Sequence, residues 1–84
     1  MNFQQECMVC IMAITKDNRK VVIQYPRPLR APDGPLTYEA LQAFEEMRAE
    51  GVQNVDRLVA VFIARNQEQY DEFMRDKEMM PQED

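Results

Sequence analysis

The chain has 84 residues, with ten basic and fifteen acidic side chains, two cysteines and no histidine, and its net charge is −5. A chain of this length forms one domain, and it holds no apolar stretch approaching the ~20 residues that cross a bilayer. Its first residues lack the positive charge and the small-residue cleavage site of a secretory signal, so we expect a cytoplasmic protein. The negative charge also argues against nonspecific binding to nucleic acid or membranes.

The charge is unevenly distributed along the chain. Residues 1–30 contain five basic and two acidic groups, whereas the remaining 54 residues contain five basic and thirteen acidic groups. The amino-terminal part therefore has a net charge of +3 and the rest a net charge of −8. This asymmetry predicts a molecule with an acidic helical side that suits a basic partner.

The first part of the chain predicts an antiparallel hairpin. Residues 7–14 form an uninterrupted apolar run, which is typical of a strand that is buried on both faces. Asp17 and Asn18 suit a turn, and residues 21–25 supply a second strand that we expect Pro26 to end. The segment from Pro26 to Pro35 contains four prolines and reads as an ordered connection.

An amphipathic helix is predicted next. Thr37 is the expected cap, and Gly51 is the expected stop. Apolar residues spaced by three and four form the expected inward stripe: Ala40, Leu41, Phe44 and Met47. The glutamates between them are expected to face water.

Residues 55–79 fit two patterns. The run from Leu58 to Ala64 is rich in β-branched residues, as in a buried strand, although a helical period also fits the whole segment. We favour a strand followed by a separate helix, because Asn66 and Gln69 have the spacing of a helix cap and its partner. This helix would bury Tyr70, Phe73 and Met74. Residues 81–84 are expected to be a frayed acidic tail.

These elements predict an α+β fold in which residues 1–80 form a single β-β-α-β-α domain. Its three-stranded antiparallel sheet would have the first strand in the middle, with a split β-α-β crossover and two helices. Because the first and third strands are apolar on both faces, both sides of the sheet need cover. Either the helices divide between the faces, or another chain covers one of them. Open edges on the second and third strands would also permit pairing between chains.

Two cysteines have the spacing of half a zinc site or of a redox dithiol. Cys7 and Cys10 are the only thiols, so a zinc site would need two chains that each contribute both. Within a strand, residues three apart point to opposite faces, which favours two buried apolar cysteines over either function. We therefore predict no metal and no cofactor.

The chain lacks the usual side chains of a catalytic site. It contains neither histidine nor serine, and its paired carboxylates, such as Glu45 and Glu46, fall on the outward face of a predicted helix. The two glycines form no phosphate-binding loop. We therefore predict a protein that is not an enzyme.

The favoured hypothesis is a small acidic interaction protein, such as an inhibitor, adaptor or assembly subunit, that binds another protein or a second copy of itself. By analogy, small acidic chains are a familiar form of phage-encoded inhibitors that present carboxylates to a basic groove. The candidate partner-binding residues are Glu45, Glu46, Glu50, Tyr70, Phe73 and Met74. Arg27 and Arg30 are a weaker candidate anion site. The alternative is a homodimer that binds zinc or a small molecule through Cys7 and Cys10 or through the proline-rich loop.

Overall fold

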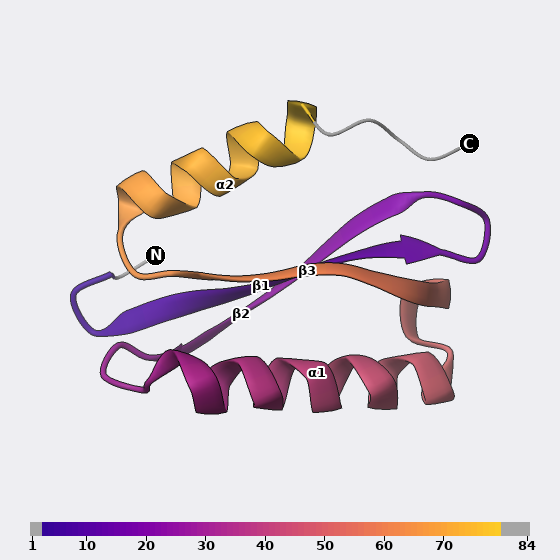
Figure 1. Ribbon diagram of the computed structural model, residues 1–84, viewed down its shortest axis with the longest axis horizontal. Coiled ribbons are helices and arrows are strands. Elements are labelled where there is room, and N and C mark those ends of the chain that lie inside the picture. Colours follow the sequence, from indigo (N-terminus) through magenta and orange to yellow (C-terminus); the bar gives the residue numbers. More distant parts are fainter. Residues whose placement is uncertain (1–2, 80–84) are drawn as a thin grey trace.

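The computed structural model describes residues 3–79 of the chain, with side chains as far as residue 75. In chain order its elements are β1 (Glu6–Thr15), β2 (Lys20–Pro28), α1 (Asp33–Glu50), a short 3-10 turn (Val52–Asn54), β3 (Val55–Ala64) and α2 (Gln67–Met79). The expected frayed tail, residues 81–84, lies outside the described residues. The predicted β-β-α-β-α order is confirmed, including a separate strand and helix after residue 55 (Figure 1).

The sheet has the predicted strand order. Strand β1 lies in the middle and pairs with β2 and β3, both antiparallel. The chain passes from β2 through α1 to β3 on the other side of β1, which is the split crossover expected from the sequence. The most apolar strand thus takes the position that is enclosed by strands on both sides and by helices above and below.

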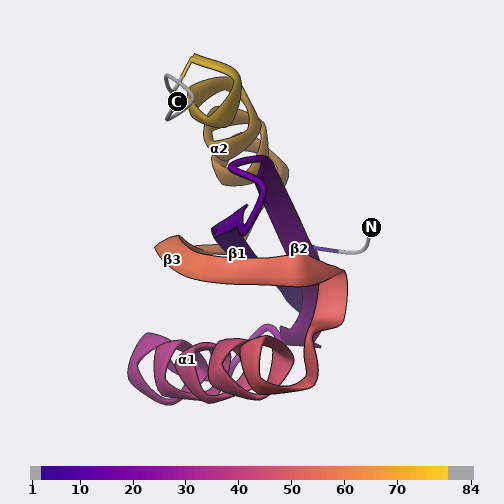
Figure 2. The same cartoon turned by 90° about the vertical axis from the view of Figure 1, so that its right-hand side faces the viewer.

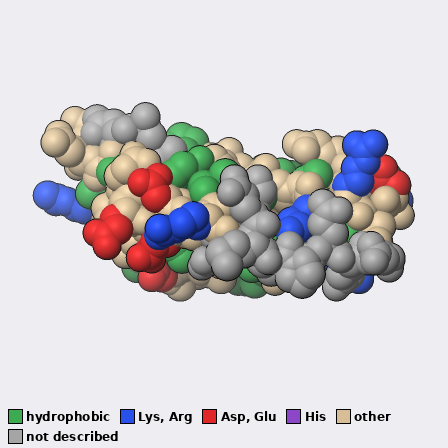
Figure 3. Space-filling model, turned by 90° about the horizontal axis from the view of Figure 1, so that it is seen from above, with side chains coloured by type: hydrophobic (Ala, Val, Ile, Leu, Met, Phe, Trp, Pro, Cys, Tyr) green, Lys and Arg blue, Asp and Glu red, His purple; other side chains and the backbone are tan. Residues whose placement is uncertain are grey.

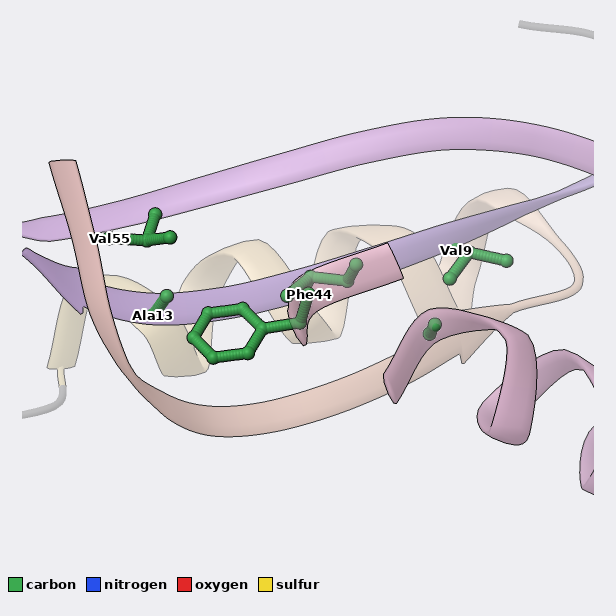
Figure 4. Packing of buried hydrophobic residues seen from close by; sticks show 6 residues of the cluster. Val9, Ala13, Phe44 and Val55 are labelled. Carbon is green, nitrogen blue, oxygen red and sulfur yellow. The ribbon is translucent and has the colours of Figure 1, made fainter. Parts of the chain in front are cut away.

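The two helices lie on opposite faces of the sheet (Figures 1 and 2). On the α1 face, Ala40 and Phe44 pack against Val9, Ile11 and Ala13 of β1, together with Val55 of β3 (Figure 4). On the α2 face, Phe73 packs against Cys10 and Met12, and its ring stacks on that of Phe62 with centroids 5.1 Å apart. Of the two arrangements left open by the sequence, the structure therefore has helices on both faces.

Helix α1 begins five residues earlier than predicted. The sequence suggested Thr37 as its cap, but the helix starts at Asp33, after Pro32 in an extended conformation (φ −72°, ψ 154°). The first backbone N–H groups of a helix have no carbonyl partner within it, so Pro35 fits the first turn without loss of a hydrogen bond. The earlier start places Leu36 in the core, while Leu41, expected to face inward, is exposed.

The end of α1 was predicted correctly. Gly51 adopts a left-handed conformation (φ 74°), and its N–H donates to the carbonyls of the last helical turn at Met47 and Arg48. Asn54 and Gln53 follow, also with positive φ, before β3 begins at Val55. The chain thus reverses within a few residues of the end of the helix.

Strand β2 continues beyond Pro26, which the sequence suggested as its end. Pro26 pairs with Met8, and Pro28 pairs with Glu6. The two prolines are two residues apart, so their ring nitrogens face the same side, and on an edge strand that side is away from the sheet. The strand therefore continues to Pro28 without loss of pairing to β1.

A bulge in β3 changes which face one of its residues occupies. Alternation along a regular strand would place Leu58 on the same face as Ala60 and Phe62. Instead Ala13 pairs with Leu58 while the preceding Met12 pairs with Ala60, so Val59 is an extra residue. Leu58 consequently packs in the α1 core, and Val59 is 42% exposed.

The start of α2 confirms the predicted cap. The Asn66 side-chain oxygen accepts a hydrogen bond from the Gln69 N–H at 2.8 Å. The Gln69 side chain in turn accepts one from the Arg65 N–H, also at 2.8 Å. This reciprocal arrangement satisfies free N–H groups at the helix start and separates β3 from α2.

Arg65 ties the proline-rich connection to the end of β3. Its guanidinium donates to the carbonyls of Leu29 (2.6 Å) and Ala31 (2.7 Å), and it pairs with the Asp33 carboxylate. The planar guanidinium supplies several donors at fixed angles, which suits this set of acceptors. It therefore holds the loop that leads into α1.

We expect Arg65→Ala to lower the free energy of unfolding by about 2 kcal/mol, because two part-buried carbonyls lose charged donors. Urea unfolding followed by circular dichroism measures this change. The matched control is Arg30→Ala, which removes an exposed arginine from the same loop and should change the stability by less than about 0.5 kcal/mol. Equal effects of the two substitutions would contradict the role given to Arg65.

Candidate binding surface on helix α1

The outward face of α1 combines an aromatic ring with carboxylates. Tyr38 is 66% exposed, and Leu41, one turn further along the helix, is 42% exposed. Glu45, Glu46 and Glu50 are also exposed, as the sequence predicted. Tyrosine is among the residues that contribute most to binding energy at protein interfaces. A ring this exposed buries little apolar area and so contributes little to the stability of the fold.

The charges on this helix are only partly neutralised. Glu39 pairs with Arg27 of β2 at 3.1 Å, and Glu45 pairs with Arg48 at 3.3 Å. Glu46 and Glu50 have no cationic partner among the residues that the structure describes. Residues seven apart lie almost two full turns apart on a helix, so Tyr38 and Glu45 share one side of α1, and this side faces water; Glu46 is also exposed.

The structure assigns Tyr70, Phe73 and Met74 to the core between α2 and the sheet. Phe73 is buried against Phe62, and the Tyr70 hydroxyl donates to the side-chain oxygen of Gln24 at 3.0 Å. The Gln24 amide donates to the Met74 sulfur at 3.6 Å. These three candidates thus hold α2 on the sheet, with Tyr70 and Met74 half-buried, whereas the three glutamates are exposed.

Arg27 and Arg30, the candidate anion site, differ in their surroundings. The Arg27 guanidinium is occupied by Glu39, whereas Arg30 is exposed in the loop before α1. Burial raises the pKa of the neighbouring Tyr25 hydroxyl, with a further upward contribution from Glu39 and an opposing one from Arg27. The Arg27–Glu39 pair therefore joins β2 to one flank of α1 instead of presenting a free cation.

A second group of charges lies at the β1–β2 turn. The Thr15 hydroxyl donates to the Asp17 carboxylate, and this bond is the main cause of the lowered pKa of Asp17; the nearby Arg19 charge also lowers it. Asn18 has a positive φ of 64° at the turn, as the sequence led us to expect of this residue type. The local cations and the carboxylate thus stabilise the hairpin.

Cys7 and Cys10 are both buried but do not meet. Cys10 belongs to the α2 core, whereas Cys7 has the parity of Val9 and Ile11 and faces the α1 side of β1. Burial raises the pKa of the Cys10 thiol to about 11. The described residues contain no group of three or more metal-ligating side chains. The arrangement gives the two thiols packing roles and offers no pair that could share a zinc ion.

Both thiols should resist modification in the folded protein. At pH 8, we expect a disulfide reagent such as dithionitrobenzoate to label neither Cys7 nor Cys10 until urea unfolds the chain, after which both react. Rapid labelling without denaturant, counted by mass spectrometry, would contradict this expectation by showing that the thiols are accessible.

The Cys10 thiol should also make the free energy of unfolding depend on pH. The folded chain keeps the Cys10 proton up to about pH 11, whereas the unfolded chain loses it near 9, so stability should fall as the pH rises through this window.

Comparisons with family models, curated proteins and solved structures found no match to this chain. Within residues 3–79, none of the helices is both long and apolar enough to span a membrane. A functional proposal for this chain therefore rests on the chemistry of its surface.

Sequence reasoning missed two residues of this surface. Leu41 was expected in the core, because its position fits a stripe with Ala40 and Phe44. Tyr38 was not singled out, although it lies two positions from Ala40 and so falls on the other side of the helix. The spacing from Ala40 and Phe44 already places Tyr38 outward, whereas the exposure of Leu41 becomes clear once Leu36 is seen to complete the buried stripe.

Proposed function

We propose that this chain is a small, non-catalytic interaction protein that binds a basic surface of another protein through the outward face of α1. The observation that carries the proposal is the exposed Tyr38 on the same outward face of α1 as Glu45, with the exposed Glu46 and Glu50 further along the helix. An aromatic anchor surrounded by carboxylates suits a partner that offers an apolar pocket with a basic rim. Inhibitors, adaptors and assembly subunits act in this way.

The uneven charge supports the same partner chemistry. Residues 31–84 have a net charge of −8, and they include both helices. Seen from the α2 side, acidic side chains also gather at the end where α2 begins, while hydrophobic side chains remain visible near the middle (Figure 3). A negative field of this kind speeds the encounter with a basic partner, and the contacts of Tyr38 would then determine how long the complex lasts.

The two acidic helices allow a matched experiment. The wild-type chain, a Tyr38→Ala variant and a Glu45→Lys/Glu46→Lys/Glu50→Lys variant are immobilised, and proteins captured from a lysate of the source organism are identified by mass spectrometry. The control is a Glu68→Lys/Asp71→Lys/Glu72→Lys variant on α2, because these three exposed acids lie on the other face of the sheet. Circular dichroism first verifies that each variant keeps the native fold.

We expect one captured protein to be lost from the α1 charge variant and reduced at least about tenfold with Tyr38→Ala, while the α2 variant retains it. Binding of the purified partner, measured by calorimetry, should weaken as salt rises, because the attraction is partly electrostatic. Equal retention by both charge variants would refute a role for α1. Loss with both would indicate attraction by total charge alone.

A further inference from the structure

The two edges of the sheet differ in how they are protected. Strand β2 carries Pro26, Pro28 and the cation Lys20, all of which oppose pairing with another strand. Strand β3 has ten residues without proline or lysine; its two charged residues, Asp56 and Arg57, lie near its start, and its run from Leu58 to Ala64 is entirely apolar. An open apolar edge of this kind is a template for strand addition.

A flank of α1 continues the apolar surface of the β3 edge. Arg48 donates to the Asp56 carbonyl of β3 at 3.4 Å, while Glu39 on the opposite flank pairs with Arg27 of β2. Leu41 lies two turns before Arg48 and therefore on the flank beside β3. Leu41 and Val59 are each 42% exposed, so the helix flank and the edge strand each carry a partly exposed aliphatic side chain.

Leu41 and Val59 lie near the middle of α1 and of β3, respectively. Helix α1 runs antiparallel to β3 (Figure 1): Arg48 contacts Asp56 near the start of the strand, and Asp33 contacts Arg65 just after its end. The midpoint between these contacts falls at residues 40–41 of the helix and at residues 60–61 of the strand. A two-fold axis through that point would therefore bring Leu41 to its own copy and place both Val59 side chains close to the axis.

We propose that the chain forms a homodimer by antiparallel pairing of β3 with β3 of a second copy, which creates a continuous six-stranded sheet. The two α1 helices would lie side by side beneath it, each with its acidic first turn at Asp33 near the basic last turn of the other at Arg48. Helix α1 packs more on β3 than on β1, so a second α1 across the β3 edge would lie next to it.

A second copy fits this surface better than an unrelated peptide. Strand addition alone would cover the backbone of β3, but it would leave Leu41 on the helix layer exposed. Only an occupant with both a strand and a helix at the same spacing covers the two layers, and this chain supplies both. The proposal goes beyond the interaction function, since Tyr38 and the three glutamates are not needed for it.

The test is the mass of the full-length protein in solution. Sedimentation equilibrium of the wild-type chain at micromolar to millimolar concentrations should give twice the 9.9 kDa of one chain. Val59→Lys places a charge at the axis, and Leu41→Glu does so in the helix layer, so each should raise the dissociation constant at least about tenfold. The control is Val52→Lys, because this exposed valine precedes β3 and lies away from the axis.

Both substituted side chains are exposed in the single chain, so the variants should keep the fold, which circular dichroism verifies. Hydrogen exchange then gives an independent readout: β3 amides that are protected in the wild-type dimer should exchange faster in the Val59→Lys variant at the same concentration. A wild-type monomer at every concentration would overturn the proposal. A dimer unaffected by Val59→Lys and Leu41→Glu would place the interface elsewhere and overturn it equally.

Discussion

Strand β1 is apolar on both faces, and the rest of the fold serves to cover it. Val9, Ile11 and Ala13 point to one side of the sheet, whereas Cys10 and Met12 point to the other. A strand of this composition is stable only between two other strands and between two layers of cover. The position of β1 in the sheet and the placement of one helix on each face both follow from this single requirement.

The two helical layers meet that requirement in different ways. Helix α1 has 18 residues and buries Leu36, Ala40 and Phe44, so it can leave a whole outward face free for polar and aromatic side chains. Helix α2 has 13 residues and depends on the Phe73–Phe62 stack and on the bonds between Tyr70 and Gln24. The candidate residues of α2, Tyr70, Phe73 and Met74, therefore pack against the sheet. Helix α1 is the element whose outward side chains are not needed for packing.

The sequence predicted the strand order, the hairpin, Gly51 and the Asn66 cap, because each depends on local chemistry or on strong apolar runs. The start of α1, the length of β2 and the exposure of Val59 were not predictable in the same way. Each depends on a neighbour that is distant in sequence: Pro26 is tolerated because β2 is an edge strand, and Val59 is displaced by its register with β1. Of the candidate surface, the glutamates followed from helical spacing, and the same spacing places Tyr38 outward, whereas the exposure of Leu41, adjacent to Ala40, needed the structure.

The edges of the sheet show the same division between local and distant effects. Two prolines and a lysine protect β2 without help from any other element. Strand β3 has no proline or lysine, and its charged residues, Asp56 and Arg57, lie near its start, where the register with β1 shifts once; a second shift, at Val59, leaves an aliphatic side chain partly exposed. If β3 functioned as a free edge, a charge at this position would be harmless to the fold and would oppose aggregation. The valine found here, like the equally exposed Leu41 of α1, instead fits the proposed pairing of two copies, in which both side chains would be covered.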